Sequence, residues 1–399
     1  MKILILLILT TFAYGKDYYP SNLSKLAVER APYIKMYVEN QAASQGGVKQ
    51  SKLIANPFLT IQSGQLRSGT ARGAVVDLTL NQPFPWPGKR EAFIHSQELL
   101  LKVSEVDLEE AKLFISHRVN LLTFQIAVAT EIEKHHAERK QRFSLVHRYL
   151  TSRPLASPRQ QIDKDMIENQ IRVFEKLMRQ VSAKRIGLME ELILLTGERD
   201  MNVVMPWDSL PLLPQKNRYE FNLENSPRIK RSENFKRLAE NRVEEARLLA
   251  RPDIIVGVNY RQENIAPTNH FYHAQVGIAL PIIDYGQHSV EIAKAQVRKE
   301  EASKKMTGYT LLSELNLSYA ELQANFESMG IFPLKDLQRL ENSFKRAETA
   351  FMKGQIDVLS FIQTDAQVHE YVELAYTSRV DYLTTLSQLE MLIGQKLEI

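Results

Sequence analysis

The chain has 399 residues, of which 44% are apolar and 25% are charged, an ordinary balance for a globular protein. Its net charge of +4 is close to neutral for this length, which argues against nucleic-acid binding. The mean hydropathy is −0.28 and the only long apolar run is N-terminal, which excludes a protein built from many apolar membrane helices. The absence of cysteine excludes disulfides, thiolate chemistry and a lipidated N-terminal cysteine.

The first fifteen residues have the pattern of a cleavable export signal. Lys2 supplies a positive start, an apolar run of about ten residues follows, and the small residues Ala13 and Gly15 stand two apart. This run is too short to span a bilayer as a stable helix. We therefore expect residues 1–15 to be a signal peptide and the mature chain to begin at Lys16.

The remainder of the chain contains the same sequence pattern in two successive copies. Pro32 recurs as Pro227 and Gly197 recurs as Gly394, at spacings of 195 and 197 residues. Such self-similarity predicts an internal duplication. The predicted first copy, connector, second copy and tail are residues 16–197, 198–225, 226–394 and 395–399.

Each copy has the same predicted order of elements. A helix opened by proline is followed by two amphipathic strands, a very long helix and a return helix. For the first copy the predicted ranges are helix 32–54, strands about 57–66 and 74–84, and helices 89–153 and 159–196. For the second copy they are helix 227–250, strands about 252–262 and 272–283, and helices 287–351 and 355–393. The second long helix is expected to bend at Gly308, Gly330 and Pro333.

A seven-residue repeat runs along the first long helix. Its members are Leu101, Leu108, Ile115, Leu122, Ala129, Phe143 and Leu150, with His136 as the one exception. A strict heptad of this length predicts left-handed coiling against neighbouring helices. We interpret His135 and His136, with Arg139 close by, as a solvated basic stretch, because adjacent helical residues diverge by about 100° and chelate poorly.

The four predicted strands each have one apolar face. Strands of this length and pattern fit a β-barrel that crosses a bilayer, but four strands cannot close, so closure requires several chains. The opposite face, which we expect to line the lumen, carries Asp77, Thr79, Asn81, Asn259 and Arg261. The alternative is a soluble helical protein with two ordinary hairpins.

Three segments carry a family resemblance. Residues 82–91 (QPFPWPGKRE) resemble the strand-to-helix junction of the heavy-metal-efflux (CzcC-like) branch of the TolC-like outer-membrane efflux protein family. Residues 351–359 (FMKGQIDVL), followed by Asp365-Ala366-Gln367, resemble the periplasmic helix turn of that family's second repeat. Residues 392–394 (LIG) resemble the end of its last helix.

The resemblance implies a mainly helical homotrimer with a twelve-stranded barrel in the outer membrane, continuous with a periplasmic α-helical tunnel. It implies a passive exit duct for metal ions or small toxic compounds, served by a periplasmic adaptor and an inner-membrane pump of RND type. We expect the adaptor to dock at the two helix turns, through Leu155, Gly354 and Asp357. The first turn departs from the family in carrying Pro154 and Pro158 in place of a glycine.

No other chemistry emerges from the motifs. Nucleophile-elbow and phosphate-loop patterns are absent from the sequence, so we expect no enzyme activity and no cofactor. His270 and His273 fall at a predicted turn, where a weak surface metal site is the less favoured interpretation. Two other functions stay open: a periplasmic coiled-coil adaptor or scaffold without a barrel, and an exit duct for type I protein secretion. An adaptor has one helical hairpin flanked by β-rich domains, whereas this chain has two hairpins and two strand pairs.

Overall fold

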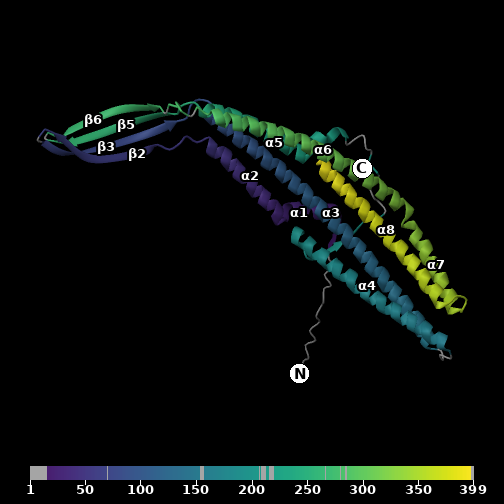
Figure 1. Cartoon of the computed structure of the whole chain (residues 1–399). Coiled ribbons are helices and arrows are strands. Elements are labelled where there is room, and N and C mark those ends of the chain that lie inside the picture. The colour runs from purple at the N-terminus through teal and green to yellow at the C-terminus, as the bar shows by residue number, and fades with distance from the viewer. Residues whose placement is uncertain are drawn as a thin grey trace, which may run out of the picture. The chain divides into compact units, whose positions relative to one another are not determined.

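The computed structural model describes residues 16–69, 71–152, 157–205, 207, 213–214, 220–265, 267–278, 280–283 and 285–396. Two sequence predictions, the signal peptide at 1–15 and the docking residue Leu155, lie outside these ranges. Figure 1 shows long helices and a small sheet as the main elements of the described chain.

Both copies contain the predicted order of helix, two strands, long helix and return helix. In the first copy the elements are β1 (Lys16–Tyr18), α1 (Pro20–Arg30), α2 (Pro32–Ser51), β2 (Phe58–Ser68), β3 (Ala71–Phe84), α3 (Lys89–Thr151) and α4 (Pro158–Thr196). The connector contains β4 (Met201–Val203) and the 3-10 helix η2 (Glu220–Asn225). In the second copy they are α5 (Pro227–Leu249), β5 (Ile254–Asn264), β6 (Asn269–Ile278), α6 (Gln287–Ile331), α7 (Lys335–Met352) and α8 (Val358–Ile393).

The second long helix is interrupted where one helix with bends was predicted. It divides into α6 and α7 at Pro333, which has no backbone N–H and restricts the residue before it, whereas Gly308 lies inside α6 without a break. Side chains of α8 donate hydrogen bonds to the carbonyl groups at this interruption. Tyr371 Oη donates to the Pro333 carbonyl at 3.3 Å and Arg379 Nη1 donates to the Phe332 carbonyl at 3.1 Å.

The chain forms two compact units, and these do not coincide with the two sequence copies. Unit 1 comprises the described residues within 1–35, 110–223 and 311–399, and unit 2 comprises those within 36–109 and 224–310. Each unit thus combines parts of both copies. The pairing of β3 with β5 joins the copies in unit 2, and the packing of α4 and α8 joins them in unit 1.

Unit 2 contains an antiparallel sheet in the order β2-β3-β5-β6. Every neighbouring pair is in a continuous register, for example Leu80 with Val258 and Val258 with Ala274. Within the described residues, β2 and β6 each pair with one strand, so they are the two edges of the sheet (Figure 1). These edges are 11 and 10 residues long.

Unit 1 is built on the packing of its helices. Heptad positions of α3 such as Ile115, Leu122 and Phe143 are 0–2% exposed, which confirms that the predicted repeat faces other helices. One core cluster comprises Phe124, Leu315, Leu322, Tyr382, Leu383, Leu386, Leu389 and Ile393. A second comprises Phe143, Val146, Ile167, Phe174, Phe344, Phe351, Val358, Phe361 and Val368.

The connector packs on unit 1. Strand β4 pairs in parallel with β1, an element that the sequence did not predict. The ring of Trp207 meets the ring of Tyr376 edge-on at 5.4 Å, and Tyr319 Oη donates to the Pro214 carbonyl at 3.0 Å. Among the described helices, none combines the length and the apolar character needed to cross a membrane.

Candidate functional site

The five polar strand residues predicted from the sequence share one face of the sheet. Asp77 lies opposite Arg261 and Thr79 lies opposite Asn259 in the register of β3 and β5. Asn81 lies opposite Gly257, whose other neighbour is Gln275 of β6. Because side chains alternate along a strand, this register places all five residues on the same side.

Side-chain hydrogen bonds connect this polar face across the strands. Asn259 Nδ2 donates to Thr79 Oγ1 at 2.6 Å, and Gln275 Nε2 donates to Asn81 Oδ1 at 2.7 Å. A Cβ atom on Gly257 would overlap Asn81 Oδ1, so the glycine makes room for the amide of Asn81. Part of the polar face is therefore organised by hydrogen bonds between neighbouring strands.

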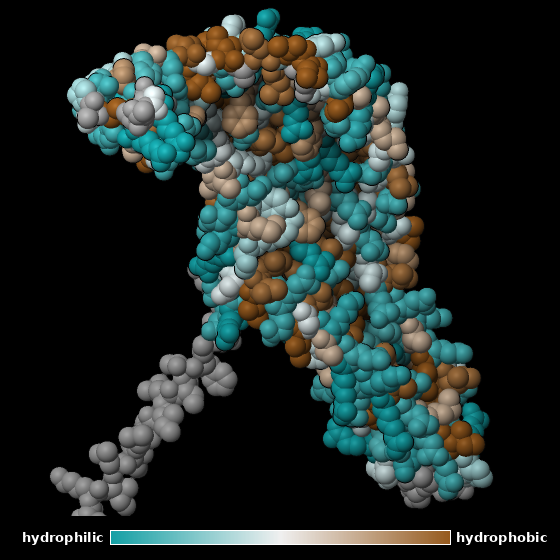
Figure 2. All heavy atoms as spheres, turned by 60° about the vertical axis from the view of Figure 1, so that its left-hand side comes forward, coloured by the Kyte–Doolittle hydropathy of each residue, from teal (hydrophilic) through white to brown (hydrophobic). Residues whose placement is uncertain are grey.

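The opposite face of the sheet is apolar and open to its surroundings. Val258 is 59% exposed, Val276 67% and Ile61 65%, although all three belong to paired strands. The upper part of Figure 2 shows apolar residues gathered over the part of unit 2 that carries the sheet. An exposed apolar face on a regular sheet marks a surface that contacts another apolar phase.

Of the three predicted docking residues, two belong to the described turn between α7 and α8. Gly354 has φ +74°, and its N–H donates to the Phe351 carbonyl at 2.8 Å. An added Cβ would meet no heavy atom within 4 Å. The expectation that a Cβ would be crowded in this turn is therefore wrong, because there is space for a side chain, and it is the left-handed backbone conformation that favours glycine.

Asp357 is the N-cap of α8. Its Oδ1 accepts a hydrogen bond of 2.8 Å from the Ser360 N–H, and hydrogen bonding from the Ser360 side chain, with that of its backbone N–H, lowers the pKa of the Asp357 carboxyl. The turn is tied to α3 as well, because Tyr149 Oη donates to the Met352 carbonyl at 2.5 Å. The C-terminal ends of α3 and α7 therefore lie side by side in unit 1.

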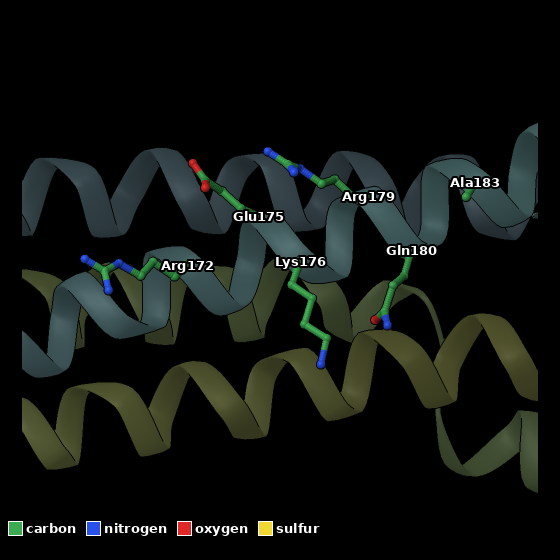
Figure 3. Close-up of a pocket in the computed structure, with 6 residues that line it drawn as sticks. All are labelled: Arg172, Glu175, Lys176, Arg179, Gln180 and Ala183. Carbon is green, nitrogen blue, oxygen red and sulfur yellow. The ribbon is translucent and has the colours of Figure 1, made fainter.

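A shallow groove of about 440 Å³ follows the surface of α4. Its lining residues are Arg172, Glu175, Lys176, Arg179, Gln180 and Ala183. Figure 3 shows that these side chains diverge: Lys176 and Gln180 point to one side of α4, and Glu175 and Arg179 to the other. Ligand sites require converging polar groups in an enclosed pocket, which this groove does not provide.

A buried ion pair joins α3 to α8. Arg139 Nε lies 3.0 Å from Asp365 Oδ2, and Arg139 Nη2 lies 2.5 Å from the same oxygen. Both side chains are 6% exposed. The guanidinium also covers the ring of Phe174, at 4.2 Å from its centroid.

Three histidines lie together next to this ion pair, and their burial overturns the expectation of a solvated basic stretch. His136 is 1% exposed, and its ring lies 4.7 Å from that of His369, which stacks on His135 at 5.4 Å. Burial lowers the pKa of His136 to about 4 and those of His135 and His369 to about 3. The prediction of a solvated basic stretch is therefore wrong for His136 and Arg139.

The sequence contained a signal for this burial. His136 occupies the heptad series of α3, whose other members are apolar, so the series itself places it against neighbouring helices. By contrast, the two histidines of the strand region do not come together. His270 and His273 belong to β6, and their spacing of three puts them on opposite faces.

The structure thus combines a duplicated pair of long helical hairpins with a four-stranded sheet that has one polar and one exposed apolar face. No protein-family model and no curated protein sequence matches the chain. Solved structures do match it over nearly its whole length, at 12–14% sequence identity. The likeness is one of fold, and it confirms the TolC-like fold expected from the sequence.

Three solved structures illustrate the likeness. A crystal structure of CusC, described in connection with folding and transmembrane channel formation, is 12% identical to this chain with a TM-score of 0.75. The match covers 96% of this chain and 93% of that one. The CmeC outer membrane channel of Campylobacter jejuni has 13% identity and a TM-score of 0.77, covering 94% and 85%. The outer membrane protein VceC of Vibrio cholerae has 14% identity and a TM-score of 0.72, covering 95% and 97%. These structures match to a similar degree, so the heavy-metal-efflux branch stays a prediction.

Proposed function

We propose that the chain is the outer-membrane channel of an efflux system, a passive exit duct for substrates delivered by an inner-membrane pump through a periplasmic adaptor. The observation that carries the proposal is the four-stranded sheet of unit 2, which has one exposed apolar face, one polar face and, among the described residues, two long edges that pair with no further strand. The fold shared with the channel structures supports it.

The edges of the sheet are the reason for proposing an assembly. In a bilayer every backbone polar group needs a hydrogen-bond partner. Within the described residues, β2 and β6 each form backbone hydrogen bonds with a neighbouring strand along one edge only. Pairing β2 of one chain with β6 of the next satisfies both edges. Three chains then give a twelve-stranded barrel with the apolar face toward lipid and Asp77, Thr79, Asn81, Asn259 and Arg261 toward the lumen.

The helices support the same assembly. The apolar residues Val173 of α4, and Met306 and Tyr309 of α6, are 44%, 67% and 73% exposed in the single chain. Contact with helices of neighbouring chains covers such residues, whereas a monomer leaves them in water. The helices then form a periplasmic tunnel, and Leu155, Gly354 and Asp357 belong to the turns that face the adaptor.

Cross-linking tests the assembly directly, because the chain has no cysteine of its own. We would introduce one cysteine on β2, at Gln62, and scan a second along β6 from His273 to Val276. Oxidised outer membranes should give a ladder of linked chains that ends at the trimer. A cysteine at Thr79 in the central strand β3 serves as the control and should give no ladder.

Two outcomes would contradict the proposal. One is a protein recovered in the soluble periplasmic fraction, which fits the adaptor alternative. The other is a membrane protein whose β2–β6 cysteine pairs never cross-link between chains. In either case the duct and its trimer would have to be given up.

A further inference from the structure

Three side chains with metal-binding atoms meet between α3 and α8, away from the sheet face and the helix turns discussed above. They are His136, His369 and Glu373, and one ligand atom from each lies within 4.8 Å of the other two. We propose that they bind a divalent transition-metal cation, with Zn²⁺ as the reference ion. This site does not depend on the proposed channel function.

The geometry of the α8 pair already fits a metal ion. His369 and Glu373 are four residues apart on one helix, which places them on the same face. His369 Nε2 lies 3.5 Å from Glu373 Oε1. Two ligands of a tetrahedral zinc ion stand about 3.3–3.4 Å apart at zinc–ligand distances of about 2.0–2.1 Å. The pair therefore needs little adjustment.

His136 supplies the third ligand from the facing helix. Its ring is almost fully buried, and its centroid lies 4.7 Å from that of His369. Three protein ligands and a water molecule complete the open tetrahedral arrangement that zinc commonly has. Two imidazoles and a carboxylate favour Zn²⁺, Co²⁺ or Ni²⁺ over Mg²⁺ and Ca²⁺, which prefer oxygen ligands alone.

Two imidazole nitrogens beside the proposed ligands also lack hydrogen-bond partners within the described part of the chain. His369 Nδ1 and His135 Nε2 are buried and have no hydrogen-bond partner among the described residues. Buried polar atoms are seldom left unpaired, and such atoms call for an ion or another unseen group. These two nitrogens are not the ligand atoms of the α8 pair, so they show only that hydrogen bonds among the described residues do not use every imidazole nitrogen here, and the proposal rests on the geometry of the three ligands.

The surrounding charges tolerate a cation. Arg139 Nη1 lies 3.4 Å from His136 Nδ1, but Asp365 balances the charge of the guanidinium. The 3.4 Å contact is long for a hydrogen bond, so it holds the imidazole weakly. When the histidines are neutral, the carboxylate of Glu373 gives the three ligands a net charge of −1. A bound divalent cation changes the net charge of the site to +1.

Metal binding at this site would link two helices from different copies of the duplicated pattern. His136 and His369 are 233 residues apart in the chain, so the three ligands are together only when α3 and α8 are packed. An ion that binds the packed form stabilises it by mass action. Added Zn²⁺ should therefore raise the melting temperature of the helices.

The test uses the purified full-length protein in detergent, freed of metal with a chelator. Co²⁺ should produce the visible absorption bands of a tetrahedral site, and Zn²⁺ should displace it and raise the melting temperature. Glu373→Gln and His369→Gln should each weaken Co²⁺ affinity by about tenfold or more. Glu373 is exposed, so its replacement leaves the helix packing intact.

A matched control and a rescue separate the site from chance binding. His288 and Glu291 are an exposed pair with Nδ1 and Oε2 3.4 Å apart, and His288→Gln should leave binding unchanged. Glu373→His keeps three ligands, so it should retain Co²⁺ with a shifted spectrum. The proposal is overturned if no Co²⁺ bands form, if Glu373→Gln and His369→Gln bind like wild type, or if His288→Gln abolishes binding.

Discussion

Arg139 of α3 and Asp365 of α8 form a two-point ion pair across 226 residues of sequence, with Arg139 Nε 3.0 Å and 3.2 Å from the two carboxylate oxygens. Neither side chain is more than 6% exposed. The pair holds α3 against α8 close to the place where His136 and His369 also meet. It therefore ties the two copies of the duplication to each other inside unit 1.

Breaking this pair should cost far more than breaking a surface pair. Asp365→Asn leaves the Arg139 charge buried without its counter-ion, and we expect a loss of about 3–5 kcal/mol in unfolding free energy. Glu168→Gln, which removes the exposed partner of Arg172, should cost less than about 1 kcal/mol. Denaturant unfolding followed by circular dichroism measures both.

The double variant Arg139→Met/Asp365→Leu distinguishes the ion pair from simple packing. It removes both charges together and should regain most of the stability lost in Asp365→Asn. A double variant as unstable as the single one would show that the charges themselves are not the cause.

Stability should fall as the pH is lowered through the histidine range. His117 and His136 have pKa values lowered to about 4, and His135 and His369 to about 3, each chiefly by burial. The unfolded chain takes up protons below about pH 6.5, whereas the folded chain takes up few until about pH 4. The stabilisation is therefore complete above pH 6.5 and is lost progressively below it.

The slope of this decline is up to about 1.4 kcal/mol per pH unit for each histidine. Melting temperatures recorded from about pH 8 to about pH 5 test it, with His369→Gln expected to flatten the curve. The exposed His288 is the control, since its replacement should leave the curve as it is. A melting temperature independent of pH would contradict the assignment.

Substitutions on opposite faces of β5 should behave differently. Val256, which is 42% exposed on the apolar face, faces lipid in the proposed barrel, and Val256→Arg should hinder membrane insertion by about 2–4 kcal/mol at mid-bilayer depth. Asn259→Arg should be tolerated, because that position faces the lumen and loses only the hydrogen bond to Thr79. The amount of each variant in outer membranes, judged by heat-modifiable migration, is the measurement. Equal loss from both would mean that the two faces are assigned wrongly.

The helix turns should matter for efflux more than for assembly. Replacing Leu155 and Gly354 together with Asp should leave the trimer intact, since the strands and the heptad positions are unchanged, while export is lost through failure of adaptor docking. Trimer cross-linking and an efflux assay in the same cells measure the two effects. Wild-type export, or loss of the trimer, would rule out docking at these turns.

A conservative change at the same turn separates conformation from docking. Gly354→Ala should cost about 1–2 kcal/mol, because φ +74° is unfavourable for a residue with a Cβ, although the added methyl group meets no neighbour. Thermal unfolding gives this cost, and export by that variant should persist once the trimer is assembled.

Several features could be predicted from the sequence because they depend on neighbours along the chain. The heptad series of α3 and the alternation of Asp77 and Thr79 with apolar residues in β3 are local periodicities, and each fixes which residues share a face. The recurrence of Gly197 as Gly394 revealed the duplication, and both residues end their helices. The fold followed from these patterns.

Tertiary structure alone decided which of those faces meet. Asp365 lies opposite Arg139, and His369 lies beside His136, only because α3 and α8 pack in one particular axial register. No local pattern encodes the relative position of two helices more than two hundred residues apart, so the heptad series could place His136 against a neighbouring helix but could not place it beside His369. The sequence by itself determined the elements and their faces, while the three-dimensional packing decided that a buried ion pair and a group of histidines would lie between them.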